Sequence, residues 1–231
     1  MRALRYRGTV LLVLALVLVS AAWATNEVLV DYSGFDWFWP ADIGQAGSCY
    51  AAVGYVNSFN PTYVNFDFST YEYTFDFDYA CFVSADTFGT TVIYTYDGST
   101  SSFDVYCDSL ATGTAADYGT NPPNAVAPST WTDGECILGA SWVGDITIVV
   151  DTSTGAGDIS GILQWDSGTQ LANIPPSQRE NSLSIAGILF NPPNGPEGYH
   201  WQIDGFTCIQ SPVAVEPTSW GRLKQGIQGD N

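Results

Sequence analysis

A strict alternation of aromatic and polar residues runs through positions 71 to 79 of the chain. In the sequence Tyr-Glu-Tyr-Thr-Phe-Asp-Phe-Asp-Tyr, every odd-numbered position is aromatic and every even-numbered position is polar. Because successive side chains of a β-strand point to opposite faces, this pattern places five rings on one face of a strand. A chain with such a segment has to cover the aromatic face with a second layer of structure.

Further alternating or β-branched segments are separated by residues that favour turns. Asp97-Gly98 supplies the positive φ of a tight hairpin between the segments 90–96 and 102–106. Between residues 25 and 212, no segment keeps helical periodicity over the length that a stable helix needs. The sequence therefore predicts an all-β protein of about ten strands, an antiparallel β-sandwich of the jelly-roll kind, with a closed barrel as the alternative. The other expected strands are 27–31, 50–57, 64–68, 145–150, 159–165, 182–190 and 199–209.

Residues 111–130 interrupt this series of strands. They are rich in Gly, Pro, Asn and Ala and predict a long loop. A loop of this length in a compact domain is either functional or mobile. Both possibilities stay open at the level of sequence.

The first 24 residues have the organisation of a signal peptide. Three arginines within the first seven residues precede an apolar stretch over 10–19. Ala22 and Ala24 then form an Ala-x-Ala cleavage site. The alternative is an uncleaved membrane anchor, but the apolar stretch is shorter than the roughly 20 residues that span a bilayer. We expect cleavage after Ala24, no membrane span in the mature chain, and a location in the extracellular medium or the cell envelope.

Removal of residues 1–24 leaves a strongly acidic chain. The mature part keeps three basic residues against 24 acidic ones, and hence a net charge of −21. A surface of this charge repels nucleic-acid phosphates and anionic lipid head groups, so neither is an expected partner. Three interpretations of the acidity stay open: solubility through self-repulsion, calcium binding, and attraction of a cationic partner.

All five cysteines lie beyond the signal segment, where an oxidising compartment favours disulfides. No Cys-x-x-Cys pair suggests a zinc or redox site. Nearness in sequence favours two bridges, Cys49–Cys81 and Cys107–Cys136. Cys208 is then left as a thiol, as an alternative bridge member or as a link to a second chain, and the oligomeric state stays open.

The C-terminal residues differ in character from the acidic β-domain, which we expect to span residues 25–212. The tail 213–231 holds two of the three basic residues of the mature chain and a short amphipathic segment with a helical pattern. Its sequence Trp-Gly-Arg-Leu-Lys, residues 220–224, resembles the short Trp-Gly-x-x-Lys tails that end many secreted proteins of environmental bacteria. This resemblance is confined to the tail and implies sorting or attachment. The alternative is that the basic tail docks on its own acidic domain.

The residue types exclude several kinds of active site. A single histidine, His200, cannot supply a zinc site built on several imidazoles. The sequence contains no Gly-x-Ser-x-Gly motif, no phosphate-binding loop and no dinucleotide fingerprint. Chemistry that depends on a serine nucleophile elbow or a bound nucleotide is therefore unsupported, and carboxylates remain as candidate catalytic groups.

Two short segments that contain glutamates resemble catalytic segments of a known enzyme class. Glu72-Tyr73 and Glu197-Gly198-Tyr199 resemble the segments around the two catalytic glutamates of small jelly-roll xylanases. The resemblance implies a carboxylate-pair glycoside hydrolase with Glu72 and Glu197 as the pair. The separation of the two residues along the chain differs from that family's pattern. The alternative is that Glu72 faces solvent opposite the aromatic face of its strand.

The segment 32–40 concentrates large rings at the start of the mature chain. Phe35, Trp37 and Trp39 are candidates for a platform that stacks on carbohydrate or contacts another surface protein. The alternative is that these rings plug the open end of the sandwich.

A Gly-rich turn at 151–158 is the candidate metal site. Asp151, Ser153 and Asp158 offer oxygen ligands that suit calcium, which is the one cofactor the sequence admits. The turn lacks the bidentate glutamate of an EF-hand loop. An ordinary β-turn built on its glycines is the alternative.

These features predict a secreted or cell-surface, non-catalytic β-sandwich protein that is structural or ligand-binding. A carboxylate-pair glycoside hydrolase on a jelly-roll scaffold is the alternative function.

Overall fold

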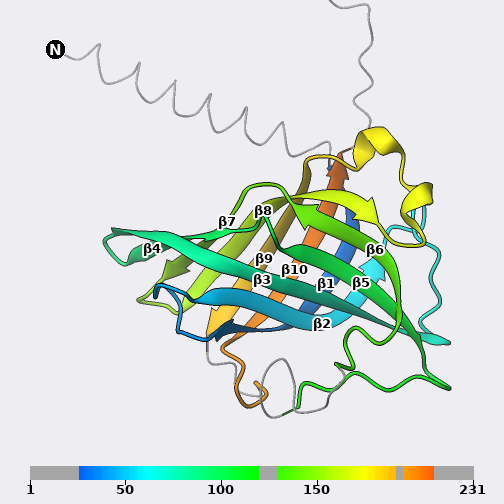
Figure 1. Ribbon diagram of the computed structural model, residues 1–231, viewed down its shortest axis with the longest axis horizontal. Coiled ribbons are helices and arrows are strands. Elements are labelled where there is room, and N and C mark those ends of the chain that lie inside the picture. The colour runs from blue at the N-terminus through cyan, green and yellow to red at the C-terminus, as the bar shows by residue number, and fades with distance from the viewer. Residues whose placement is uncertain (1–25, 120–128, 191–194, 211–231) are drawn as a thin grey trace, which may run out of the picture. The chain divides into compact units, whose positions relative to one another are not determined.

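The computed structural model describes residues 26–119, 129–190 and 195–210, and it contains ten β-strands (Figure 1). The predicted signal segment and the C-terminal tail lie outside the described residues, so the predictions about them stay predictions. Two short 3-10 helices, η1 (Leu171–Asn173) and η2 (Pro176–Gln178), follow the eighth strand. The strands are β1 (Asn26–Trp39), β2 (Cys49–Phe59), β3 (Tyr71–Phe88), β4 (Thr91–Asp97), β5 (Ser102–Ser109), β6 (Glu135–Trp142), β7 (Asp145–Asp151), β8 (Ala156–Ser167), β9 (Ser182–Phe190) and β10 (Trp201–Gln210).

All ten strands belong to one antiparallel sheet with the order β2-β1-β10-β9-β8-β6-β5-β3-β4-β7. A further pairing between β2 and β3 closes this sheet on itself. In Figure 1, β2, β3 and β5 lie in front of β1, β10 and β9. The predicted all-β, antiparallel architecture of about ten strands is confirmed, and the layers that face each other across the core are parts of one continuous sheet.

Two long strands, β3 and β8, each pair with two successive strands along the same edge. The first half of β3 pairs with β5 and its second half pairs with β4. In the same way β8 pairs first with β7 and then with β6. Because β4 also pairs with β7, these two strands extend the sheet beyond the part closed by β5 and β6.

Two elements differ from the expected list of strands. Residues 64–68 are not a strand, because the carboxylate of Asp67 accepts hydrogen bonds from the Ser69 amide and the Thr70 hydroxyl and so forms a turn. Strand β6 was not expected, since its sequence Glu-Cys-Ile-Leu-Gly-Ala-Ser-Trp lacks a clear alternation. The total of ten strands is thus reached with one expected segment replaced by another.

The main core lies on the inner face of the sheet. Tyr73, Phe75 and Phe77 are buried there, as the alternation along β3 predicts. Tyr71, at the start of the strand, remains 40% exposed. Tyr79 does not join the core, because a β-bulge places Asp78 and Tyr79 of β3 opposite the single residue between Tyr50 and Ala52 of β2. The prediction of five rings on one face therefore holds for the middle of the strand and fails at Tyr79.

One of the two expected disulfides is present. Cys49 and Cys81 face each other on β2 and β3 and are bonded, as predicted. The expected bridge between Cys107 and Cys136 is wrong, since both are free cysteines. Cys107 packs against the inner core, whereas Cys136 pairs with the outward-facing Tyr106, so the two thiols lie on opposite faces of the sheet.

Within the described residues, the structure holds no helix with the length and apolarity that crossing a membrane requires.

Candidate functional site

A second apolar cluster lies outside the core, on the outer face of β1, β2 and β3. Described residues between β5 and β6 lie over this face, among them Ala116, Tyr118 and Trp131, and we call them the covering segment. Part of the covering segment comes from the long loop expected from the sequence. Hydrogen bonds hold the cover in place, including one from the Thr74 hydroxyl to the Trp131 carbonyl at 2.7 Å. The buried members are Trp37, Ala51, Val53 and Trp131, with Tyr55, Tyr79, Ala116, Tyr118 and Tyr199 packed against them.

The three rings singled out in the segment 32–40 all fall on or near this outer face. Phe35 contacts Tyr118 edge-on, with ring centroids 5.0 Å apart. Trp37 contacts Tyr199 edge-on at 5.5 Å and is only 3% exposed, whereas Trp39 is 62% exposed. The structure thus differs from both interpretations of these rings. Phe35 and Trp37 do not form an open platform and do not plug the end of the core; they lie on the outer face of the sheet, beneath the covering segment.

A cavity of about 190 Å³ opens at one side of this covered apolar cluster. Three strands and the covering segment meet there, and the bulge in β3 brings both Asp78 and Tyr79 to the outer face. The rings of Trp37 and Tyr79 have centroids 6.1 Å apart and an interplanar angle of 84°. They form two walls at nearly a right angle. The lining residues are Trp37, Ala51, Val53, Asp76, Phe77, Asp78, Tyr79, Ser129 and Thr132.

Carboxylates form the polar side of the cavity. Burial first, and then the neighbouring charges of Asp78 and Asp104, together raise the pKa of Asp76 to about 7. Burial also raises the pKa of Asp104, while a hydrogen bond from the Ser102 hydroxyl opposes that rise. Asp78 is exposed, and its carboxylate accepts a hydrogen bond from the Tyr79 amide at 2.8 Å. Near neutral pH the cavity therefore contains Asp76, whose protonated and ionised forms are both populated, next to the solvent-exposed carboxyl group of Asp78.

The two glutamates of the hydrolase hypothesis have different surroundings. The carboxylate of Glu72 accepts a hydrogen bond from the amide of Ala116 at 2.8 Å, so it helps to hold the covering segment. Glu197 is exposed in the segment that leads into β10. The catalytic pairing of Glu72 with Glu197 stays a prediction.

The turn between β7 and β8 is closed by its own hydrogen bonds. The carboxylate of Asp151 accepts from the Ser153 amide at 2.8 Å and from the Ser153 hydroxyl at 2.6 Å. Asp158 lies in β8, opposite Val149. Among the residues that the structure describes, no group of three or more His, Cys, Asp or Glu side chains is placed to hold a metal ion. Calcium binding at Asp151, Ser153 and Asp158 stays a prediction.

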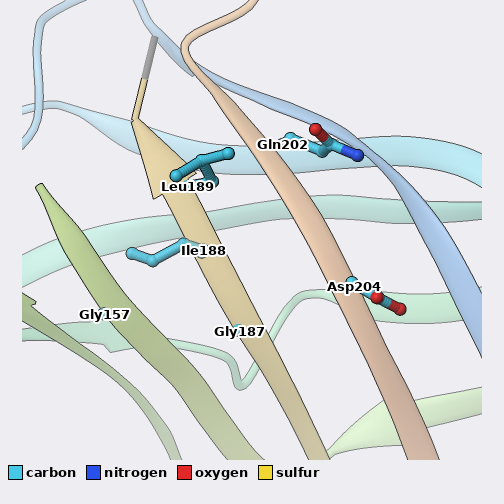
Figure 2. A pocket seen from close by; sticks show the side chains of 6 residues that line it. All are labelled: Gly157, Gly187, Ile188, Leu189, Gln202 and Asp204. Carbon is cyan, nitrogen blue, oxygen red and sulfur yellow. The ribbon is translucent and has the colours of Figure 1, made fainter. Parts of the chain in front are cut away.

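A larger but more open hollow of about 390 Å³ lies over β8, β9 and β10 (Figure 2). Gly187 stands opposite Asp204 in the strand register and contributes no side chain to it. Figure 2 shows Gln202 and Asp204 both projecting from β10, with Leu189 on β9. We favour the smaller cavity as the functional site, because two rings and two carboxylates converge there, whereas the larger hollow is lined by one carboxylate and one amide.

One buried carboxyl group was not singled out from the sequence. Asp36 lies on the inner face of β1 and is fully buried, and its Oδ1 accepts a hydrogen bond from the Trp201 amide at 2.9 Å. Burial raises the pKa of Asp36 well above its ordinary value, and hydrogen bonds from Trp201 and Tyr50 oppose this in part. Alternation places Asp36 on the face opposite Phe35 and Trp37, but it does not show that this face is the inner one, so the pattern alone gave no sign of its burial.

The cavity residues Asp76, Asp78 and Tyr79 were also missed as a site. Their sequence shows only a regular strand, because a bulge depends on how the partner strand is paired.

Comparisons of the chain with protein-family models, with curated proteins and with solved structures find no match.

Proposed function

We propose that the mature chain is an exported, non-catalytic binding protein whose site is the cavity formed by Trp37, Asp76, Asp78 and Tyr79. The observation that carries this proposal is the convergence of two perpendicular rings and two carboxylates on one small cavity. These side chains stand on paired strands, which hold a binding geometry better than loops do.

The size of the cavity supports binding over catalysis on a polymer. Its volume of about 190 Å³ lies below the roughly 300–1,000 Å³ typical of sites for drug-sized ligands. It therefore suits a small molecule or one group of a larger partner. A glycoside hydrolase has to hold sugars on both sides of the bond that it cleaves.

Export is supported by the chemistry of two cysteines. The Cys49–Cys81 disulfide fits an oxidising compartment, which the signal segment predicts. The same bridge links β2 to β3 close to the bulge that forms the cavity.

A second candidate function rests on the two carboxyl groups of the cavity. Burial raises the pKa of Asp76 to about 7, while Asp78 is exposed. Two carboxyl groups in different environments can act as proton donor and as base or nucleophile in glycoside hydrolysis. In this second proposal, Asp76 and Asp78 take the roles that the sequence suggested for Glu72 and Glu197.

A ligand screen with a parallel turnover assay tests the two candidates. Two-dimensional NMR of the mature protein would follow the indole signals while a panel of saccharides, amines and small peptides is added. We expect saturable shifts at the Trp37 indole without turnover. Tyr79→Leu should weaken these shifts at least tenfold, and Trp39→Ala should leave them unchanged.

Two outcomes would count against the proposal. Turnover of a glycoside that Asp76→Asn abolishes would favour the hydrolase. Ligand binding that responds to Leu189→Ala and is insensitive to Tyr79→Leu would move the site to the hollow over β8 to β10.

A further inference from the structure

We infer that the group bound by the cavity is a small organic cation, an amine or a quaternary ammonium group. This inference rests on the proposed function, because it names the ligand class of the same site. Three features of the described residues support it: the arrangement of the rings, the placement of the carboxylates, and the scarcity of basic side chains.

The two rings provide faces that attract a cation. Trp37 and Tyr79 both line the cavity, and their rings stand edge to face, at 84° with centroids 6.1 Å apart. A group in the cavity is therefore bounded by both rings. Aromatic faces attract cations within about 6 Å of the ring centroid, and Trp and Tyr are the strongest of the aromatic residues in this respect. A corner built from two rings is a general way to hold an alkylated ammonium group.

The carboxylates add negative charge on the open side. Asp76 and Asp78 line the cavity, and Asp104 lies opposite Asp76 on β5. The hydroxyl-bearing residues Ser129 and Thr132 contribute polar groups from the covering segment. A neutral ligand would leave the repulsion among these acids in place, whereas a cation relieves it.

The β-domain itself carries very little positive charge. Between residues 25 and 215 the sequence has 22 acidic residues, and Arg179 is its single Lys or Arg. The Arg179 side chain donates through Nε to the carbonyl of Ile174, in the segment with η1 and η2. The long-range field of the domain therefore favours the approach of a cation and disfavours an anion.

Cation binding should be coupled to the release of a proton. On its own strand, Asp76 interacts electrostatically with Asp78 and Tyr79. On β5 it interacts with Asp104 and Tyr106, and Asp104 in turn interacts with Asp166. On the β1 and β2 side, the lining is Trp37, Ala51 and Val53, which carry no charge. A cation beside Asp76 favours its ionised form, so binding should strengthen as the pH rises through 7.

The experiment compares choline with 3,3-dimethylbutan-1-ol, an uncharged molecule of nearly the same shape. The indole NMR signal of Trp37 in the mature chain, assigned with Trp37→Phe, reports on both titrations, and glucose serves as a neutral saccharide. We expect choline to bind at least tenfold more tightly than the alcohol. Choline should also bind at least fivefold more tightly at pH 8 than at pH 5.5.

Matched variants connect the result to the cavity. Asp76→Asn should weaken choline binding and remove its dependence on pH between 5.5 and 8. Tyr79→Leu should weaken it at both pH values. Asp86→Asn removes one exposed charge from β3, outside the cavity lining, and should change the affinity less than twofold.

The possible failures are distinguishable. Equal affinity for choline and the neutral alcohol would overturn the cation inference and leave the site in place. Glucose binding that depends on Tyr79, with no effect of choline, would do the same. If none of the three probes shifts the Trp37 signal, the inference and the proposed site are both wrong.

Discussion

Asp76 on β3 lies directly opposite Asp104 on β5, so two carboxyl groups share one position of the antiparallel ladder. Like charges at such a position destabilise a sheet. Burial and the charges of Asp78 and Asp104 raise the pKa of Asp76 to about 7. The folded protein therefore holds a proton on Asp76 at pH values where the unfolded chain has released it.

The first prediction concerns stability as a function of pH. Because the pKa of Asp76 is raised from 3.8 to about 7, the folded state binds more protons than the unfolded state between these values. Asp76 should therefore lower the free energy of unfolding progressively as the pH rises from 4 to 7, by a total of the order of 4 kcal/mol. In urea denaturation, Asp76→Asn should be more stable than the unmodified protein at pH 8 and should show a flatter pH profile. The exposed Asp86, changed to Asn, is the control, and an equally flat profile for that variant would contradict the assignment.

The second prediction concerns the cysteines. Non-reducing peptide mapping should find the Cys49–Cys81 bridge and free thiols at Cys107 and Cys136. Replacement of Cys49 and Cys81 together by Ala should cost about 3 to 4 kcal/mol, because the bridge closes a loop with a sequence separation of 32. Cys136→Ser should leave the map unchanged. A Cys107–Cys136 peptide would show that the two side chains do not lie on opposite faces of the sheet.

The third prediction separates two neighbouring tryptophans. Trp37→Ala should lower the free energy of unfolding by about 3 to 5 kcal/mol, since the ring is buried between β2 and the covering segment. Trp39→Ala should change it by no more than about 0.5 kcal/mol, because that ring is 62% exposed. Chemical denaturation at pH 7 measures both. Similar losses for the two variants would mean that the covering segment does not bury Trp37 in solution.

The fourth prediction concerns two strand glycines. A Cβ at Gly34 would lie 2.1 Å from the carbonyl oxygen of Val53 and 2.7 Å from the Cα of Gly54, and both are backbone atoms. Gly34→Ala should therefore lower the melting temperature strongly or prevent folding, because β1 and β2 would have to separate. Gly187→Ala is the matched control: its Cβ meets only the Asp204 carbonyl oxygen at 3.9 Å, so the melting temperature should stay within a few degrees. An equal loss for the two variants would count against the close approach of β1 and β2.

Local patterns placed several features correctly. The alternation along residues 71–79 predicted the buried rings Tyr73, Phe75 and Phe77, and Asp97-Gly98 predicted the turn between β4 and β5. Such features depend on the intrinsic geometry of a strand or a turn. The Cys49–Cys81 pair was found from nearness in sequence, which succeeded because β2 and β3 are neighbours in the sheet.

Nearness in sequence gave a wrong prediction for the other pair of cysteines, Cys107 and Cys136. Cys107 and Cys136 are on adjacent strands, but a register shift between β5 and β6 leaves them on opposite faces. A shift of one residue reverses the face of every following side chain. Such a shift is set by the hydrogen bonds of the partner strand and leaves little trace in the local sequence.

Alternation and composition can be taken directly from the residues, and they were enough to predict antiparallel strands with an aromatic core face and an extreme negative charge. Three further features became visible only in the folded chain: β2 pairs with β3, a bulge turns Tyr79 outward beside Asp78, and residues before β6 cover Trp37. These outcomes depend on which strands pair and in which register. The candidate site is a product of those pairings, and for that reason the strand pattern alone did not reveal it.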